Sequence, residues 1–528
     1  MKKFLCLIFG ASFTFFLSAQ PTIQWQKCLG GTNYDAAASA QQTNDGGYIV
    51  VGLTQSVNGD ITTNHGVVDV WVIKLAFDGN IQWQKTLGGS SIEVGNSIQK
   101  TTDGGFIIAG YTLSNDGDVS GNHGSTDCWI VKLNSNGDIQ WQKTLGGSQE
   151  DRATAIQQTQ DGGYIFAGHT NSSDGDVSTN HGVNDFWVVK LSSTGTIEWE
   201  KALGGTGADE AYSISQTSDG GYVVAGATMS NNGDVSGNNG NLDYWVVKLT
   251  NSGTIEWQKA LGGTGADDGR LAYQTSDGGY LVAGTQGSGD GQVSVSLGWT
   301  DYWIVKLNQT GDIQWEKSLG GSEQDVLGAM LLTEDGGCVL SGFTESKDGD
   351  VMNNDVIFDI WVVKLNILGE IQWSKAIGGS LADFSGEIHK TSDGGYVLTG
   401  TTESSDGDVS GNHGFYDCWV VKLSPASSPT SEIHARTLEI YPNPATNTIS
   451  FLPAVALAEE GLAVSPAVAS AEEGLLVQIT DLLGQVLSHQ TISTNHTVDV
   501  STLPNGVYIL SAVTASGTVF SGKFSKLE

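Results

Sequence analysis

The hydrophobic positions of residues 23–423 follow one pattern that recurs along the chain. Residues 127–147 show it, with an apolar run that begins at Asp127, an Asn-Gly turn, and a second run around Trp141. Two β-rich runs on either side of such a turn predict a β-hairpin. One tryptophan marks each run in seven copies that lie 58 residues apart. The first run carries Trp71, Trp129, Trp187, Trp245, Trp303, Trp361 and Trp419, and the second carries Trp25, Trp83, Trp141, Trp199, Trp257, Trp315 and Trp373.

Two further strands precede the hairpin in each copy. In the second copy, residues 96–101 and 105–112 are apolar or alternating runs around a Thr-Asp-Gly-Gly turn, and a polar loop over 114–126 follows. Such a unit is predicted to be a four-stranded antiparallel meander, whose third strand is apolar on both faces and must be covered on both. Seven such units around one axis predict an all-β fold, a seven-bladed β-propeller over residues 20–424.

The ends of the repeat array predict a closed ring. The chain enters with a fourth strand at 23–27 and leaves after a third strand at 419–423, so the two fragments complete one blade. The alternative is an open solenoid, which would need terminal capping repeats for solubility.

The register of the hairpin predicts where the cysteines lie. With Gly137 in the left-handed position of a three-residue loop, Lys132 faces Gln140, and the two copies that follow pair a lysine with a glutamate. The same register in the closing blade puts Cys28 opposite Cys418, which predicts a disulfide across the ring closure. Alternatively, these cysteines fill apolar slots, because a one-residue bulge would spoil the approach of their Cα atoms. Two further cysteines are interpreted as packing residues, Cys128 and Cys338.

Composition narrows the range of partners. The 528 residues include 24 basic and 58 acidic side chains, which gives a net charge of −34. Fourteen of the basic residues occupy two positions of the repeat, so no basic stripe remains and nucleic acid is not expected as a partner. They are Lys74, Lys132, Lys190, Lys248, Lys306, Lys364 and Lys422, and Lys27, Lys85, Lys143, Lys201, Lys259, Lys317 and Lys375.

The N-terminus has the three parts of a secretory signal peptide over residues 1–19. Two lysines are followed by an apolar run and then by small residues before Gln20. The mature chain is therefore expected to be exported, and no later run is long and apolar enough to span a bilayer.

The polar loop of each copy contains the main candidates for ligand binding. Asp-Gly-Asp sequences in four copies predict oxygen ligands for calcium, whereas Asx-turns account for the same residues without a metal. The candidate ligands are Asp116, Asp118, Asp174, Asp176, Asp348, Asp350, Asp406 and Asp408. Trp299 lies in a fifth loop that departs from the consensus, so it is a candidate stacking residue of a recognition patch. Drift of that loop is the alternative.

Histidine and aspartate at two other repeated positions are predicted to stabilise turns. A histidine that recurs in four copies and becomes Asn239 in another is better explained as a turn residue than as a catalyst or metal ligand. These histidines are His65, His123, His181 and His413. The aspartate before the first tryptophan of every copy is predicted to hydrogen-bond the loop backbone. These aspartates are Asp69, Asp127, Asp185, Asp243, Asp301, Asp359 and Asp417.

The repeats resemble a group of secreted bacterial and archaeal propeller repeats. That group has Gln-Thr-x-Asp-Gly-Gly-Tyr and Asp-x-Trp motifs, which stand here at 216–226 and 243–249. The resemblance covers about four hundred residues and supports the propeller fold. It implies no particular activity, because the group shares none.

The tail beyond the repeats differs in composition. Residues 425–436 are rich in Ser and Pro and predict a linker. Alternating strands with Gly turns over 437–528 predict a small Ig-like β-sandwich. A near-duplicated segment within it predicts an inserted loop at 453–475.

The tail closely resembles the C-terminal sorting domain of the type IX secretion system of Bacteroidota. The resemblance rests on Tyr-Pro-Asn-Pro, Asp-x-x-Gly-Gln and Leu-Pro-Asn-Gly-x-Tyr motifs and on a terminal strand with lysines. The first and third motifs supply Tyr441, Pro442, Asn443, Pro444, Leu503, Pro504, Asn505, Gly506 and Tyr508. The resemblance implies the type IX secretion machinery as a partner, followed by release or anchoring at the outer cell surface.

Together these features predict a secreted or cell-surface propeller that binds a glycan or a protein. No catalytic motif is recognisable, so the chain is not predicted to be an enzyme. The alternatives are a polysaccharide hydrolase or lyase, with candidate acids such as Glu323, Asp325 and Asp383, or a structural surface-layer component. Calcium is the one cofactor for which the loops contain candidate ligands.

Overall fold

The computed structural model describes residues 20–351, 354, 358–426, 436–453, 475–480, 486–492, 497–513 and 519–527. The predicted signal peptide, nearly all of the predicted linker and most of the predicted inserted loop lie outside the described residues. The chain divides into two compact units, residues 1–427 and 428–528. No helix occurs among the described residues.

Among its described residues, the first unit contains 28 strands. Blade 1 is β2 (Asp35–Gln42), β3 (Tyr48–Thr54), β4 (Asp69–Leu75) and β5 (Ile81–Leu87). Blade 2 is β6 (Glu93–Lys100), β7 (Phe106–Thr112), β8 (Asp127–Leu133) and β9 (Ile139–Leu145). Blade 3 is β10 (Asp151–Gln158), β11 (Tyr164–Thr170), β12 (Asp185–Leu191) and β13 (Ile197–Leu203). Blade 4 is β14 (Asp209–Gln216), β15 (Tyr222–Thr228), β16 (Asp243–Leu249) and β17 (Ile255–Leu261).

The remaining three blades follow the same plan. Blade 5 is β18 (Asp267–Gln274), β19 (Tyr280–Gln286), β20 (Asp301–Leu307) and β21 (Ile313–Leu319). Blade 6 is β22 (Asp325–Leu332), β23 (Cys338–Thr344), β24 (Asp359–Leu365) and β25 (Ile371–Ile377). Blade 7 is β26 (Asp383–Lys390), β27 (Tyr396–Thr402), β28 (Asp417–Leu423) and the N-terminal strand β1 (Ile23–Leu29).

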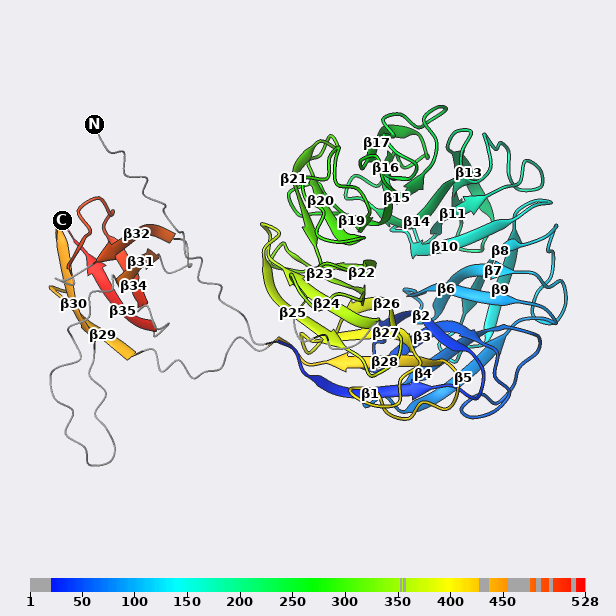
Figure 1. The fold of residues 1–528 in the computed structure, drawn as a ribbon, viewed down its shortest axis with the longest axis horizontal. Coiled ribbons are helices and arrows are strands. Elements are labelled where there is room, and N and C mark those ends of the chain that lie inside the picture. Colours follow the sequence, from blue (N-terminus) through cyan, green and yellow to red (C-terminus); the bar gives the residue numbers. More distant parts are fainter. Residues whose placement is uncertain are drawn as a thin grey trace, which may run out of the picture. The chain divides into compact units, whose positions relative to one another are not determined.

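The seven sheets form a closed ring, as predicted (Figure 1). Blade 7 has the order β1-β28-β27-β26, so the first strand of the chain pairs with the last strand of the repeat array. The first strand of each blade, which we call the inner strand, lies nearest the axis of the ring. We call the side with the inter-blade connections and the long loops the loop face, and the side with the Thr-x-Asp-Gly-Gly turns the turn face.

The third strand of each blade is buried on both faces, because neighbouring blades cover it. All seven tryptophans of the first run are buried. The indole nitrogen of Trp129 donates a hydrogen bond of 2.9 Å to Gln142 on the next strand, so its one polar atom is satisfied. Each apolar core lies between two blades; one, for example, combines Ile49 and Val72 of blade 1 with Trp129 of blade 2.

The lysine of the third strand holds the turn face of each blade together. The ammonium of Lys132 lies 2.9 Å from the Asp103 carboxylate of the first turn, and it donates hydrogen bonds to Gln140 and to the Leu133 carbonyl. These bonds satisfy a charge on a nearly fully buried side chain. Seven of the fourteen repeated lysines are therefore structural.

The predicted hairpin register is wrong by one residue over most of its length. Gly137 has a φ of 81° and Leu133 pairs with Ile139, both as predicted. A bulge between Lys132 and Leu133 then shifts the register, so that Lys132 pairs with Trp141 instead of Gln140. The predicted contact between Lys132 and Gln140 nevertheless forms, because both Gln140 and Trp141 lie opposite the lysine.

The second unit is also formed by strands. They are β29 (Arg436–Tyr441), β30 (Thr448–Pro453), β31 (Leu475–Thr480), β32 (Val486–Ile492), β33 (Thr497–Asp499), β34 (Gly506–Val513) and β35 (Val519–Lys526). Their order is β32-β31-β34-β35-β29-β30-β33, in which β29 runs parallel to β35. Ile449, Val498, Leu510 and Phe524 share one core, so strands from the middle and from the β33 end of this order contribute to it. The predicted Ig-like topology stays a prediction.

Within the part of the chain that the structure describes, no helix is long and apolar enough to cross a membrane.

Candidate binding sites around the propeller axis

The inner strands are the least repetitive part of the blades. The residue after the first acid of this strand differs between most of the copies, whereas the third strand keeps Asp-x-Trp, its lysine and its last leucine in all seven. That inner-strand position is occupied by Ala36, Val94, Arg152, Glu210, Asp268, Val326 and Phe384. Side chains that a scaffold does not need to repeat are free to serve a ligand, so the axis of the ring is the first place to look for a site.

Blades 3, 4 and 5 bring unlike charged groups together near the loop face. We call this group the charged cluster, and it consists of Glu150, Arg152, His169, Asn184, Glu210, Tyr212, Asp268 and Arg270. The Arg152 guanidinium stacks 4.5 Å from the ring centroid of Tyr111, and Arg270 stacks 4.5 Å from that of Tyr212. A stacked guanidinium keeps its N–H edge available for bidentate contacts.

Glu210 connects the two halves of the charged cluster. One oxygen accepts a 2.9 Å hydrogen bond from Asn184, and the other accepts a 3.0 Å bond from the Tyr212 hydroxyl. Arg270 lies 2.6 Å from Asp268. Burial raises the pKa of Tyr212, and the neighbouring carboxylates Asp268 and Glu210 raise it further. The cluster is therefore a continuous network across three blades.

Several polar atoms of the charged cluster remain without partners among the described residues. They are Arg152 Nε, Arg270 Nε, His169 Nδ1 and Asp268 Oδ1, all buried. Arg152 Nε lies 2.9 Å from Glu150, but its N–H is not aligned to donate a hydrogen bond. Burial lowers the pKa of His169, which favours the neutral imidazole. Because buried polar groups normally find partners, a group of four such atoms marks the charged cluster as an unusual part of the scaffold.

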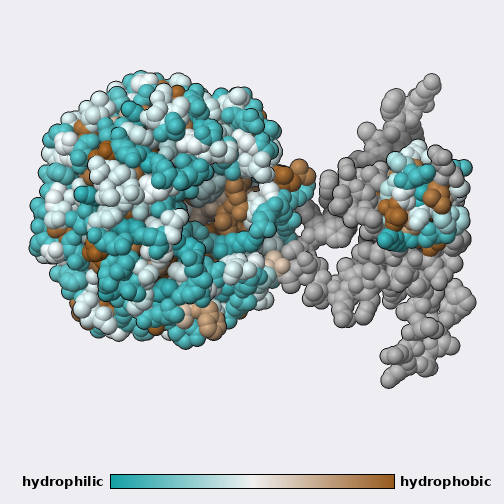
Figure 2. All heavy atoms as spheres, turned by 180° about the vertical axis from the view of Figure 1, so that it is seen from behind, coloured by the Kyte–Doolittle hydropathy of each residue, from teal (hydrophilic) through white to brown (hydrophobic). Residues whose placement is uncertain are grey.

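On the loop face, aromatic residues lie across the axis from the charged cluster. The rings of Phe343, Phe358 and Phe384 lie 5.3–5.7 Å apart, and Tyr34 lies 5.5 Å from Tyr416. Phe358 has a φ of 62°, which a bulky residue adopts only under constraint. In a space-filling view the propeller is hollowed near its centre, and hydrophobic residues line part of the hollow (Figure 2). Charged and aromatic groups thus surround one axis.

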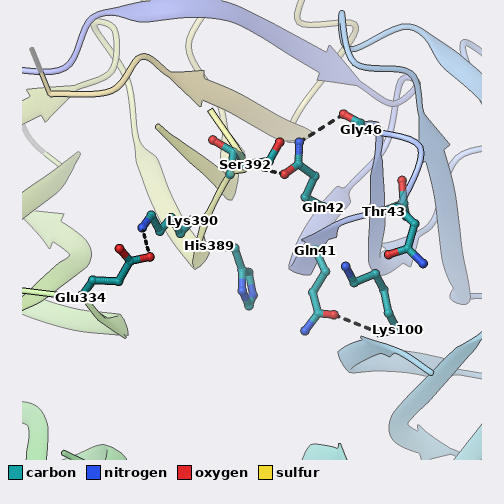
Figure 3. A pocket seen from close by; sticks show the side chains of 11 residues that line it. Gln41, Gln42, Thr43, Gly46, Lys100, Glu334, His389, Lys390 and Ser392 are labelled. Carbon is teal, nitrogen blue, oxygen red and sulfur yellow. Dashed lines mark hydrogen bonds and ion pairs between the residues drawn. The ribbon is translucent and has the colours of Figure 1, made fainter. Parts of the chain in front are cut away.

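A pocket of about 640 Å³ opens on the turn face, where the inner strands of blades 1, 2, 6 and 7 end (Figure 3). Its polar lining includes Lys100, Glu334, His389, Lys390 and the amide of Gln41. His389 Nε2 lies 3.0 Å from Glu387, and the Lys390 ammonium lies 2.7 Å from Glu334. We call this site the turn-face pocket.

Trp299 lies on the surface, as expected of a stacking residue. Its side chain is 78% exposed, and Val295 and Leu297 in the same loop are also exposed. The loop belongs to the loop face of blade 5, next to Asp301 at the start of β20. Its role in recognition stays a prediction.

The carboxylates of the Asp-Gly-Asp loops accept hydrogen bonds from backbone N–H groups, and calcium binding by these loops stays a prediction. Asp116 accepts a 2.7 Å hydrogen bond from the Ser90 amide, and Asp118 accepts one of 3.2 Å from the Gly88 amide. The same bonds recur for Asp174, Asp176, Asp348, Asp350 and Asp406, while Asp408 uses its own backbone amide to bond Gly378. Across the described residues, no group of three or more His, Cys, Asp and Glu side chains is placed to hold a metal.

The repeated histidine and aspartate form a turn motif, as predicted. Asp127 accepts hydrogen bonds of 2.9 Å from the His123 amide and 2.8 Å from its imidazole. The other oxygen of this aspartate has no hydrogen-bond partner among the described residues, and the same holds in every blade. Across each inter-blade connection this aspartate faces the first acid of the next inner strand. A Cβ on Gly204, for example, would lie 2.5 Å from Asp185 and 2.6 Å from Asp209.

The predicted disulfide between Cys28 and Cys418 is wrong. Both thiols are free, and the bulge described above makes Leu29 the partner of Cys418 and Trp419 the partner of Cys28. Residues one position out of register point to opposite faces of a strand pair. Cys28 therefore packs in the core between blades 6 and 7, and Cys418 in the core between blades 7 and 1. Cys128 and Cys338 are buried packing residues, as predicted.

The four thiols are expected to be inert in the folded chain. Burial raises the pKa of Cys28 and of Cys338 to about 12, so the reactive thiolate is scarce at neutral pH. Labelling with a maleimide should be slower in the native chain than in denaturant by a factor on the order of a hundred. A bridged peptide containing Cys28 and Cys418 in a non-reducing digest would contradict both the register and this expectation.

The two sorting motifs form hydrogen bonds at the last strand and the turn before β34. Asn443 accepts a 2.9 Å hydrogen bond from the Ser525 amide and donates one to the Lys523 carbonyl. The Tyr508 hydroxyl donates a 2.7 Å bond back to the Pro504 carbonyl, which closes the Leu-Pro-Asn-Gly turn. Tyr441 ends β29 and leads into the first motif.

The charged cluster and the turn-face pocket are not among the sites predicted from the sequence. The predicted candidates lie in the loops of the copies, whereas these two sites depend on differences within the inner strand. The positions of the basic residues in the sequence could have indicated both sites. Of the five that lie in the propeller outside the two repeated positions, Lys100, Arg152, Arg270, Lys347 and Lys390, all but Lys347 lie on inner strands.

Comparison with known proteins identifies the tail. Residues 439–525 match the family described as "Secretion system C-terminal sorting domain". The tail is thus a sorting domain of the type IX secretion system and marks the chain for secretion by that system.

Similarities of the remaining chain are distant. Regulatory protein FlaEY of Caulobacter vibrioides is 25% identical over 183 residues, which are 33% of this chain and 19% of that protein. PorZ, a surface component of the type IX secretion system of Porphyromonas gingivalis, is 12% identical with a TM-score of 0.40, over 95% of this chain and 60% of PorZ. A puromycin hydrolase is 10% identical with a TM-score of 0.42, over 82% of this chain and 62% of that protein. These similarities carry no argument about function.

Proposed function

We propose that this chain is a secreted, non-enzymatic binding module whose ligand is an extracellular glycan, recognised by the charged cluster. The observation that carries the proposal is the meeting of two stacked guanidinium groups with carboxylates in that cluster. The side chains of Arg152 and Arg270 are each 37% exposed and that of Asp268 is 23% exposed, so N–H groups and a carboxylate oxygen can reach a ligand. A sugar hydroxyl both donates and accepts, so adjacent hydroxyls satisfy both kinds of group.

The aromatic side of the loop face supports the same ligand class. Phe343, Phe358 and Phe384 form an apolar surface next to the axis, and Trp299 adds an exposed ring in the loop of blade 5. Binding sites typically combine apolar surface with a few polar groups that fix orientation. The apolar C–H faces of a pyranose fit such rings, while its hydroxyls reach the charged cluster.

An enzymatic reading has less support. Asp325 and Asp383 are first acids of inner strands, and the equivalent acid of every blade bonds the same inter-blade connection. Glu323 is an exposed residue of such a connection. An acid that accepts the same structural hydrogen bond in all seven blades is a poor candidate for a single catalytic centre.

The test measures binding of the full chain to a panel of oligosaccharides by calorimetry. Glu210→Gln and Arg270→Met should each weaken binding by about ten- to a hundredfold, because a hydrogen bond to a charged group contributes about 1.5–3 kcal/mol. Arg152→Lys keeps the charge but loses the planar fork, so a smaller loss is expected.

Lys347→Met is the matched control, because it removes a propeller cation away from the cluster. Circular dichroism at the temperature of the titration should show that every variant is folded, to exclude a loss of fold. Parental affinity in Glu210→Gln and Arg270→Met would contradict the proposed site. Release of shorter products from a bound oligosaccharide would contradict the non-enzymatic role.

A further inference from the structure

The turn-face pocket lies where two lysines replace a structural glutamine. In four copies the last residue of the inner strand is a glutamine. Its side-chain amide oxygen accepts a hydrogen bond from a backbone N–H in the first turn of the preceding blade. These bonds are Gln42 to Ser392 at 2.7 Å, Gln158 to Thr102 at 2.9 Å, Gln216 to Gln160 at 3.0 Å and Gln274 to Ser218 at 2.8 Å. The equivalent residues of blades 2 and 7 are Lys100 and Lys390.

The replacement removes an inter-blade hydrogen bond on both sides of the pocket. A lysine has no acceptor, so Lys100 cannot bond the Asn44 amide, and Lys390 cannot bond the Glu334 amide. Both Asn44 and Glu334 line the turn-face pocket together with the two lysines. The loss of an inter-blade bond therefore coincides with the opening of a cavity.

The two ammonium groups belong to exposed side chains on the turn face. The Lys100 ammonium forms no hydrogen bond or ion pair with any described residue, and its side chain extends toward the pocket (Figure 3). Lys390 pairs with Glu334, whose side chain is 89% exposed. An exposed pair contributes little and exchanges readily. The third-strand lysines are instead nearly fully buried, as Lys132 is against Asp103.

We propose that the turn-face pocket is a second binding site, which takes the oxyanion of an acidic ligand between Lys100 and Lys390. The Gln41 side-chain N–H₂ and the His389 ring lie between the two lysines and offer further polar contacts (Figure 3). The site is separate from the charged cluster, because it lies at the other end of the inner strands. A carboxylated or a sulfated sugar supplies the same anionic oxygens, so either fits.

An anion is favoured over a neutral ligand by the local charge of the pocket, against the net charge of −34 of the whole chain. At physiological salt the screening length is about 8 Å, so an anion in the pocket interacts mainly with the nearby ammonium groups, of which that of Lys100 has no carboxylate partner among the described residues. The glutamine of the other blades would serve a neutral ligand equally well and would keep the inter-blade bond.

The experiment titrates the full chain with hexagalacturonate, a fully sulfated hexasaccharide, inorganic phosphate and maltohexaose. The acidic hexasaccharides should bind and maltohexaose should not bind at this pocket. Lys100→Gln restores the residue of the other blades, so it should raise the thermal midpoint and weaken the acidic ligand at least tenfold. Lys390→Gln should do the same, and Lys347→Gln should leave the affinity for the acidic ligand unchanged.

The outcomes separate the two sites. Binding of hexagalacturonate but not of the sulfated sugar or phosphate assigns the pocket to carboxylates, and the reverse assigns it to sulfate or phosphate esters. Acidic binding that survives Lys100→Gln and Lys390→Gln, or that is lost only in Arg270→Met, overturns the second site and leaves the proposed function intact. If none of the acidic ligands binds, the second site is likewise overturned. If the turn-face variants lose glycan binding and the variants of the charged cluster do not, the proposed function is overturned.

Discussion

Deleting residues 20–31 is expected to unfold the propeller or to lower its thermal midpoint by more than about 10 °C. The deletion removes β1, the fourth strand of blade 7, and leaves β28 as an open edge. It also removes Cys28 and Leu29 from two cores, and the Trp25 ring from its 5.4 Å contact with Tyr48. Thermal unfolding followed by circular dichroism measures the effect.

Adding the missing strand separately provides the control for this deletion. A synthetic peptide of residues 20–31 should restore the midpoint, because the strand pairs with β28 over six residue pairs. A peptide with Trp25→Ala should restore less, and a scrambled peptide should restore nothing. A truncated chain that unfolds at the parent's midpoint would mean that the ring does not depend on this closure.

Most of the scaffold is predictable from the sequence because the same physical demand recurs seven times. A strand such as Asp127–Leu133 has apolar residues on both faces, so it must be sandwiched, and stacking the units in a ring satisfies this demand in every blade. The closing strand is predictable because the repeat array begins with a lone fourth strand and ends after a third strand, so the two fragments complete one blade. The hydrogen bond between Asp127 and the His123 backbone follows from an acid that precedes a buried strand in every copy.

The hairpin register is not predictable from the same pattern. A bulge adds one residue opposite Lys132 without altering the alternation that marks the strand, since Gln140 and Trp141 are both compatible with a half-buried surface. One residue of shift then turns Cys28 and Cys418 to opposite faces. A prediction that depends on register fails at such a point, even where the strand assignment is right.

The candidate sites escape the sequence for a different reason. Arg152 and Glu210 are ordinary surface residues when each copy is considered alone. The ring joins them through His169, because the inner strands of blades 3 and 4 meet at the axis. The repeat builds the scaffold and leaves the inner strand free to differ, so it is the positions that fail to repeat that point to the ligand.

Acidification from pH 8 to pH 5 is expected to stabilise the propeller, raising the thermal midpoint by about 5 °C. Burial, together with Asp383 and Asp408, raises the pKa of Asp359 to about 7, and burial raises those of Asp243 and Asp325 to about 6. The folded chain therefore retains protons that the unfolded chain loses near pH 4. Stability falls as pH rises from about 4 to about 7, because the unfolded state binds fewer protons over that range.

The aspartates of the Thr-x-Asp-Gly-Gly turns are expected to lower the stability of the propeller at low pH. Burial tends to raise the pKa of Asp45, but hydrogen bonds from Thr43 and Lys74 outweigh it and lower the value to about 2. Asp103, Asp161, Asp219 and Asp277 also have a pKa of about 2. Their contribution is present above pH 4 and is lost as the pH falls toward 2. The midpoint should therefore pass through a maximum near pH 4 to 5 in a series of thermal scans.

Two asparagine substitutions distinguish the two kinds of aspartate. Asp359→Asn removes a charge that the folded state holds at a cost, so it should raise the midpoint at pH 8 and flatten the decline between pH 5 and pH 8. Asp45→Asn is the matched control, because it breaks the 2.9 Å pair with Lys74 and should lower the midpoint at pH 8. A midpoint that rises steadily from pH 5 to pH 8 in the parent, or that falls at pH 8 in Asp359→Asn, would show that these inter-blade carboxylates are held charged at no cost.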